Sequence, residues 1–200
     1  LSGPIPPELG ELTNLKTLWL GENQLSGPIP PELGEMSNLE YFYVSGNQLS
    51  GPIPPELGGL INLQYLQLDS NQLSDSIPPE LGDLANLQYL HLESNLLSGS
   101  IPPELGDLAK LRLFSIRSNQ LSGLIPSELG DLDDGLLSSS DIRWNRLMTP
   151  DAELNAFLDS IQMVDNDWSA TQTVEPLDLM IETVGSNSVT LAWEPIEYTD

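Results

Sequence analysis

His91 is the only histidine in the chain, and it lies two residues before Glu93. Asp69 precedes Glu93 by 24 residues, the period of a repeat described below, so we expect the two carboxylates on neighbouring structural units. One histidine with two carboxylates could bind a metal ion, or the histidine could act as a general base. The sequence offers no second histidine and no nucleophile with an orienting partner. We therefore predict no catalytic residue, no metal site and no cofactor, and interpret His91 as a ligand contact or inert surface.

Aromatic residues recur at equivalent positions of the same repeat. Tyr41, Tyr65 and Tyr89 are 24 residues apart, and Trp19 and Tyr43 form a second such column. Tyrosine and tryptophan carry much of the binding energy at protein interfaces, so an outward-facing array of them predicts an adhesive surface. The alternative is that these rings are present only because aromatic side chains pack well across neighbouring strands.

The same surface changes from aromatic to charged along the chain. Its middle, from Gln67 to Glu93, is expected to be polar and acidic. Its last part contains four of the six basic residues, namely Arg112, Arg117, Arg143 and Arg146. The candidate ligand contacts are Trp19, Tyr41, Tyr43, Tyr65, Gln67, Asp69, Tyr89, His91, Glu93 and Arg117.

A second set of columns is acidic. One contains Glu8, Glu32, Glu56, Glu80, Glu104 and Glu128, and the other contains Glu11, Glu35, Asp83, Asp107 and Asp131, interrupted by Gly59. Like charges on adjacent units repel each other, although the amides of a nearby helical turn offset part of this. We interpret these columns as a solvated edge that keeps the protein soluble. A stripe that collects divalent cations or a basic partner is the alternative.

All of these columns depend on a repeat of 24 residues. Its clearest marker is an asparagine, present at Asn23, Asn47, Asn71, Asn95 and Asn119 and again at Asn145 after 26 residues. A fixed period in this range, with leucines in a constant pattern around the asparagine, predicts one supersecondary unit stacked on copies of itself.

Each repeat contains the signals of a strand, a turn and a helical segment. Leu18-Trp19-Leu20 and its equivalents alternate as a short strand does, so the units should build a parallel sheet. The asparagine that follows is expected to bond to backbone groups where the chain leaves the sheet. Gly51 permits a positive φ in the next turn. The run 54–58 (PPELG) predicts a helical turn that proline opens and Gly58 ends.

These residues resemble the plant-type leucine-rich repeat, with the pattern L-x-x-L-x-x-L-x-L-x-x-N-x-L-S-G-x-I-P-x-x-L-G-x-L. The match extends from residue 1 to about residue 131. The resemblance implies an α/β leucine-rich-repeat solenoid, with a curved parallel sheet on its concave side and short helical turns elsewhere. It also implies binding of a peptide, a protein or a small hormone, and no enzymatic activity in the repeats.

The repeats end in an atypical unit. Residues 132–137 (LDDGLL) contain two extra residues, and residues 141–147 (DIRWNRL) recover the pattern. We assign residues 1–148 to the repeats, with a partial first unit, five full units and this atypical last one. Residues 149–173 are expected to form a helical C-terminal cap and linker, with Thr149 as N-cap and Leu154, Phe157, Leu158 and Ile161 facing the last coil. Trp168 is expected to pack under this cap.

The last segment has a different character. Residues 177–181 and 189–193 alternate in polarity around a turn at 185–187 (GSN), which predicts a β-hairpin. The string 185–195 (GSNSVTLAWEP) is similar to the first two strands of a fibronectin type III domain, in which the residue at the place of Trp193 lies in the core. We therefore assign residues 174–200 to the N-terminal fragment of a truncated β-sandwich of this type. The arrangement implies a multidomain extracellular parent protein.

Composition limits the possible partners. The net charge of −24 disfavours nucleic acid and anionic membrane surfaces. No apolar run is long enough to insert into a membrane, and the chain contains no cysteine. Because Leu1 lies inside a repeat, we expect the signal and anchor to lie outside this sequence. We predict a monomeric, extracellular or cell-surface module that binds a protein or peptide on its concave face; the alternatives are a structural spacer of a surface adhesin, and carbohydrate binding.

Overall fold

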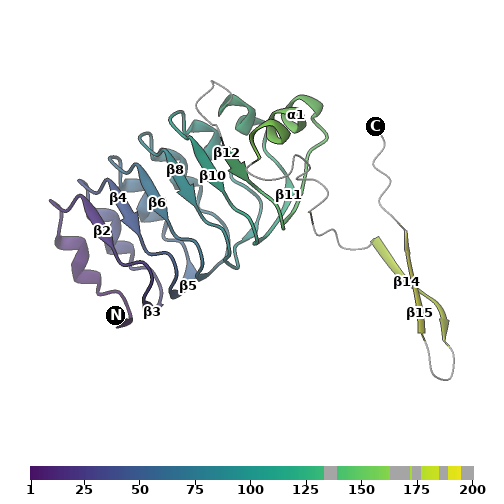
Figure 1. Ribbon diagram of the computed structural model, residues 1–200, viewed down its shortest axis with the longest axis horizontal. Coiled ribbons are helices and arrows are strands. Elements are labelled where there is room, and N and C mark those ends of the chain that lie inside the picture. Colours follow the sequence, from purple (N-terminus) through teal and green to yellow (C-terminus); the bar gives the residue numbers. More distant parts are fainter. Residues whose placement is uncertain (133–138, 163–171, 173–176, 185–188, 195–200) are drawn as a thin grey trace.

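Stacked coils form a parallel sheet of six short strands, one from each repeat. The computed structural model describes residues 1–132, 139–162, 172, 177–184 and 189–194. The strand order is β12-β10-β8-β6-β4-β2, so neighbours in the sheet are also neighbours in the chain (Figure 1). The strands are β2 (Thr17–Trp19), β4 (Tyr41–Tyr43), β6 (Tyr65–Gln67), β8 (Tyr89–His91), β10 (Leu113–Ser115) and β12 (Ser139–Asp141). This confirms the parallel sheet that the repeat pattern predicts.

A row of 3-10 helices runs along the opposite side of the array. They are η1 (Pro7–Glu11), η2 (Pro31–Glu35), η3 (Pro55–Gly59), η4 (Pro79–Asp83), η5 (Pro103–Asp107) and η6 (Ser127–Leu132). Pro55 opens η3 as expected, but the helix continues through Gly58 instead of ending there. A Cβ on Gly58 would lie 2.4 Å from the carbonyl oxygen of Glu80. This glycine is therefore required by the close approach of the next coil.

The Leu-Ser-Gly segments form two further parallel sheets, which we did not expect from the sequence. One has the order β1-β3-β5-β7 and the other β13-β11-β9. Their strands are β1 (Ser2–Gly3), β3 (Gln24–Gly27), β5 (Gln48–Pro52), β7 (Gln72–Ser74), β9 (Ser98–Gly99), β11 (Gln120–Leu124) and β13 (Arg146–Met148). Gly51 has the expected positive φ, 82°. The two sheets are separated near Asp75, which takes the place of this glycine with a φ of 64°.

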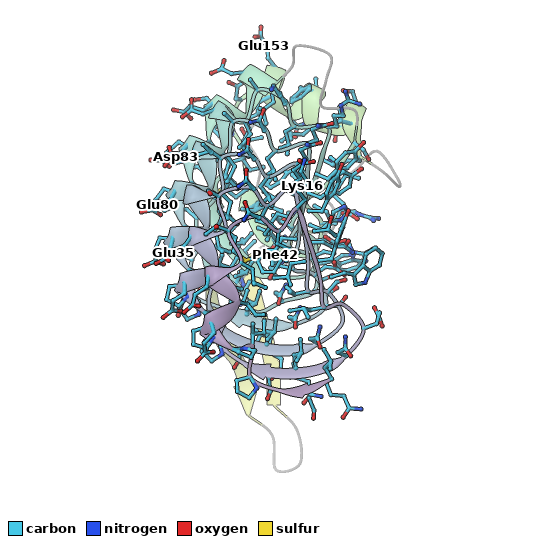
Figure 2. The ribbon with its side chains drawn as sticks, turned by 90° about the vertical axis from the view of Figure 1, so that its left-hand side faces the viewer. Lys16, Glu35, Phe42, Glu80, Asp83 and Glu153 are labelled. Atoms are coloured by element: carbon cyan, nitrogen blue, oxygen red, sulfur yellow. The ribbon has the colours of Figure 1, made fainter. Side chains whose placement is uncertain are left out.

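Leucines fill the space between the sheets and the 3-10 helices. Leu63, Leu66, Leu68 and Leu81 of a single repeat are all completely buried. Phe42 lies in the same interior, at the place of Leu66 one coil earlier (Figure 2). Because each coil buries these side chains only against its neighbours, the stack is one continuous core.

The asparagines form a buried ladder that binds each coil to the one before it. Asn71 Nδ2 lies 3.0 Å from the carbonyl oxygen of Val44 and 3.1 Å from those of Leu68 and Asp69. Asn71 Oδ1 accepts a hydrogen bond of 3.0 Å from the backbone N–H of Leu49. This confirms the structural role that the sequence predicts.

The ladder continues into the atypical last repeat and ends on a glutamine. Asn145 Nδ2 donates to Ile116 O at 3.0 Å, and its Oδ1 accepts from Leu121 N at 3.1 Å. One coil further, Gln172 Oε1 accepts from Leu147 N at 2.9 Å, and Gln172 Nε2 donates to Ile142 O at 3.3 Å. The side chain of Gln172 therefore makes the bonds that the next asparagine would make.

Helix α1 (Ala152–Ile161) follows the last repeat and lies at the β12 end of the array (Figure 1). Leu154, Leu158 and Ile161 are buried, and Phe157 packs against the same core, as expected for a cap. The predicted start of the helix was wrong by two residues. Asp151 is the N-cap, because its carboxylate accepts hydrogen bonds from Glu153 N and Leu154 N, whereas Thr149 Oγ1 only accepts from Asp151 N.

The last described element is a hairpin of two antiparallel strands, β14 (Leu177–Val184) and β15 (Val189–Glu194). The antiparallel pairing of these two strands agrees with the alternating polarity of the sequence. Residues 185–187, Trp168 and the insertion at 133–137 lie outside the described residues, and so do the side chains of both hairpin strands, including that of Trp193.

Candidate functional site

The outward-facing residues of the six-stranded sheet form the columns that the repeat predicts. Thr17, Tyr41, Tyr65, Tyr89, Leu113 and Ser139 are successive register partners. Trp19, Tyr43, Gln67, His91, Ser115 and Asp141 form the second column. We call this surface the sheet face.

The five aromatic candidates form one continuous cluster on the sheet face. The ring centroids of Tyr65 and Tyr89 are 4.0 Å apart with an interplanar angle of 13°, and those of Tyr41 and Tyr65 are 5.5 Å apart. Tyr43 lies 6.0 Å from Tyr65 and 5.0 Å from Trp19, whose ring is tilted by 41°. Trp19 ends the cluster and is 72% exposed.

Crowding of the rings changes their acid–base properties. Burial raises the pKa of Tyr65 to about 12, assisted by a hydrogen bond with Tyr89. Burial and the neighbouring Tyr41 also raise the pKa of Tyr43 above its usual value. Both phenols are therefore neutral at physiological pH and act as hydrogen-bonding groups.

Asp69, His91 and Glu93 lie together in the middle of the sheet face. Ser70 N donates to Glu93 O at 2.9 Å, which places Asp69 and Glu93 on adjacent coils. His91 Nδ1 lies 3.2 Å from Glu93 Oε1. Burial raises the pKa of Asp69. Burial acts in the same direction on Glu93, but hydrogen bonds, led by the one from His91, outweigh it and leave the pKa of Glu93 lowered.

Two arginines at the C-terminal end of the sheet face, Arg117 and Arg143, are engaged in ion pairs. Arg143 is buried, and its Nε and Nη2 donate to the two carboxylate oxygens of Asp141 at 2.9 and 2.8 Å. Arg117 Nε lies 3.7 Å from Asp141 Oδ2. The expected outward-facing position of Arg143 was therefore wrong, because its side chain is buried against Asp141. Ser115 in the column of Asp141 is also buried.

The geometry of the repeats agrees with a comparison to known families. The leucine-rich-repeat family model matches residues 14–36, 38–60, 62–84, 86–108 and 110–132, which together are more than half of the chain. The chain belongs to the leucine-rich-repeat family. No curated protein matches this leucine-rich-repeat chain.

Several solved structures share the fold of this leucine-rich-repeat chain. The ectodomain of the plant receptor kinase GASSHO1/SCHENGEN3 from Arabidopsis thaliana, in complex with CASPARIAN STRIP INTEGRITY FACTOR 2, is 40% identical with a TM-score of 0.75; the match covers 80% of this chain and 19% of that one. The ectodomain of the Arabidopsis receptor kinase HAESA, in complex with an extended IDA peptide hormone, is 38% identical with a TM-score of 0.68, covering 74% and 25%. A plant ice-binding protein is 37% identical with a TM-score of 0.68, covering 74% and 47%.

The leucine-rich repeats bring nine of the ten candidate residues into two groups. The first contains Trp19, Tyr41, Tyr43, Tyr65 and Tyr89. The second contains Gln67, Asp69, His91 and Glu93. Arg117 instead associates with Asp141 and Arg143. Among the described residues, no group of three or more histidine, aspartate or glutamate side chains could hold a metal ion.

Sequence reasoning missed a polar ladder beside the tyrosine column of these repeats. Lys16 Nζ donates to Glu40 Oε1 at 2.6 Å, Gln64 Nε2 to Glu40 Oε2 at 3.5 Å and Gln88 Nε2 to Gln64 Oε1 at 3.4 Å. The hydrogen bond to Glu40 raises the pKa of Lys16. The 24-residue spacing was the signal that could have revealed this ladder.

The acidic columns lie on the row of 3-10 helices, along a different edge of the leucine-rich repeats from the aromatic cluster. All of their members in η1 to η6 are exposed. Figure 2 shows Glu35, Glu80 and Asp83 pointing outward from this edge. Within the described chain, no helix has the length and apolar character required to cross a bilayer.

Proposed function

We propose that the sheet face binds an extended peptide or a protein segment in an extracellular module without enzymatic activity of its own. The aromatic cluster carries this proposal, because it offers five large side chains in one continuous patch whose rings are already packed against each other. Binding to a preformed patch orders few side chains and so costs little conformational entropy.

The similar structures support this proposal. The HAESA ectodomain was solved with a peptide hormone, the GASSHO1/SCHENGEN3 ectodomain with CASPARIAN STRIP INTEGRITY FACTOR 2, and the structure of PEPR1 contains AtPEP1. The chain spans only 19–26% of the length of the chains in these three structures. We extend to this chain the binding of a peptide and an extracellular location. The assignment of residues 174–200 to the start of a fibronectin type III-like domain and the monomeric state remain part of the proposal.

The packing of the rings favours a peptide over a carbohydrate. A sugar ring stacks on the face of an aromatic ring, but the faces of Tyr65 and Tyr89 cover each other at 4.0 Å. These tyrosines present ring edges and hydroxyl groups, which suit the polar backbone and mixed side chains of a peptide. Of the cluster, Trp19 has the most exposed ring.

A library of displayed peptides, selected on the whole chain at fixed salt, tests this proposal. We expect enriched peptides that lose at least tenfold in affinity, about 1.4 kcal/mol, with Tyr43→Ala/Tyr65→Ala. The matched control is Glu56→Gln/Glu80→Gln on the acidic edge, which should retain the affinity. Failure to enrich any peptide would favour the structural spacer, and loss of binding only in the control variant would show that the ligand uses the other edge.

A further inference from the structure

The N-terminal end of the sheet face has an open aromatic surface. Trp19 is 72% exposed, and Tyr43 lies beside it with ring centroids 5.0 Å apart and planes tilted by 41°. The tilt leaves the indole incompletely covered, in contrast to the stacked pair of Tyr65 and Tyr89. An exposed indole face attracts cations more strongly than the other aromatic side chains do.

Small residues adjoin this aromatic surface. Gly21 and Ser45 stand at equivalent positions of the first two coils, where the next coil has Asp69. A Cβ on Gly21 would lie 3.3 Å from the carbonyl oxygen and from the hydroxyl of Ser45, and 3.7 Å from Trp19 Nε1. A Cβ at position 21 would therefore crowd Ser45 and touch the indole, whereas glycine leaves this place uncovered.

Two carboxylates border the same place. A Cβ on Gly46 would lie 2.5 Å from Glu22 Oε1, so the carboxylate of Glu22 rests on the residue that follows Ser45. Asp69 occupies the next position of the Gly21 and Ser45 column. Its Oδ1 is buried beside Gln67, and its Oδ2 accepts from the Ser70 hydroxyl at 3.1 Å, so Asp69 contributes its negative charge from the edge of this place.

Several basic side chains of the sheet face neutralise other carboxylates. Lys16 binds Glu40 at 2.6 Å, and both Arg117 and Arg143 associate with Asp141. The negative charges of Glu22 and Asp69 therefore stand next to an aromatic surface, an arrangement complementary to a cation on a ligand.

We propose that Trp19 and Tyr43, together with the carboxylates of Glu22 and Asp69, form a subsite for the guanidinium or ammonium group of a ligand's arginine or lysine. The cation packs on the indole and is neutralised by the two carboxylates. This inference rests on the proposed binding of a peptide, and it specifies the chemistry of one ligand residue and its place at the N-terminal end of the face.

Two capped pentapeptides that differ in one charge test the subsite. The first is acetyl-Ala-Pro-Arg-Pro-Ala-amide, and the second has citrulline, the uncharged analogue of nearly equal shape, in place of arginine. Each is titrated into the whole ¹⁵N-labelled chain while the indole N–H resonance of Trp19 is followed, with Trp19→Phe identifying that resonance. We expect a saturable shift with the arginine peptide and at least tenfold weaker binding of the citrulline peptide.

Two variants with the same change in net charge show which carboxylates bind the arginine peptide. Glu22→Gln/Asp69→Asn should weaken the arginine peptide at least tenfold, whereas Glu56→Gln/Glu80→Gln on the acidic edge should leave its binding unchanged. Both variants replace carboxylates by amides of similar size, and an unchanged circular dichroism spectrum and melting temperature verify that each is folded.

Three results would overturn the subsite: equal binding of the two peptides, equal loss in the two variants, or no shift of the Trp19 resonance. The broader proposal is judged separately by the displayed library. Enriched peptides without arginine or lysine that still require Tyr43 and Tyr65 would overturn the subsite and leave peptide binding intact. Binding of the arginine peptide without enrichment of any library peptide would support the subsite and would overturn the wider contact of a peptide with Tyr43 and Tyr65.

Discussion

The sheet face and the acidic edge are built by the same repeat, yet they differ in how their columns vary. On the acidic edge, glutamate stands at the equivalent position of six successive coils, from Glu8 to Glu128. On the sheet face, the column that begins at Trp19 changes its residue type at every coil, from Tyr43 through Gln67 to His91. The repeat thus keeps one column uniform and makes the other irregular.

This difference separates positions that serve the stack from positions that can recognise a ligand. A uniform column repeats one physical task in every coil, as Asn71 and its equivalents do in the interior. An irregular column gives each coil a distinct chemical character, which specific recognition of a peptide requires. The comparison predicts that changes in uniform columns alter folding and that changes on the sheet face alter binding.

The largest expected effect on stability is in the buried asparagine ladder. Asn71→Ala removes the acceptor of Leu49 N and the donor to Val44 O and Leu68 O, and we expect a loss of about 1–3 kcal/mol in the free energy of unfolding. Urea denaturation measures it. Asn62→Ala is the control, because exposed Asn62 makes a single bond of 2.8 Å to Ser37 O. Equal losses in the two variants would contradict a special role for the buried ladder.

A smaller effect is expected where the ladder ends. Gln172→Ala removes the bonds to Leu147 N and Ile142 O, and the lost stability should be about 1 kcal/mol, because these groups are only partly buried. Hydrogen exchange of the Leu147 amide should also become faster. Gln120→Ala, which truncates an exposed glutamine, is the control. An unchanged exchange rate at Leu147 would show that Gln172 does not complete the ladder in solution.

The fold was largely predictable because one pattern recurs at a fixed spacing. The register of Tyr41, Tyr65 and Tyr89 followed from that period alone, and so did the bonds of Asn71. The second row of strands was missed, since a segment such as 48–52 (QLSGP) contains glycine and proline, which are rare in strands. The helix N-cap was also missed: Thr149 and Asp151 are both good caps, and only the geometry selects Asp151.

The candidate site was less predictable, because its properties arise from contacts between columns. The sequence places Arg143 in a basic region but does not show that its guanidinium turns back to Asp141. It places Tyr65 and Tyr89 in one column but does not show that their rings stack at 4.0 Å. Side-chain direction depends on neighbouring coils, and a repeat pattern specifies only the backbone positions.

Salt offers a test of the uniform acidic edge. The exposed carboxylates of adjacent coils repel each other at neutral pH, and added ions screen this repulsion, so the melting temperature should rise in about 0.5 M NaCl. Calorimetry of the wild type and of Glu56→Gln/Glu80→Gln measures the response. The variant should respond less to salt because it has fewer repelling charges. An identical response in both proteins would mean that the salt acts elsewhere.

The smallest effect concerns the irregular sheet face, where a single phenol should affect stability only at alkaline pH. The folded-state pKa of Tyr65 is raised from 10.0 to about 12, because burial and the hydrogen bond with Tyr89 favour the neutral form. A raised pKa stabilises the folded state fully below the unfolded value of 10.0, and this contribution is lost as the pH rises to about 12.

The Tyr65→Phe variant lacks the phenol and therefore lacks this pH-dependent contribution. We therefore expect the difference in urea midpoint between wild type and Tyr65→Phe to be constant up to pH 10. Above pH 10, the midpoint of the wild type should fall relative to that of the variant. The other titrating groups are common to both proteins and largely cancel in this difference. Absorbance at about 295 nm should show one fewer late-titrating tyrosine in the variant. Parallel midpoint curves across this range would show that the phenol of Tyr65 ionises as it does in water.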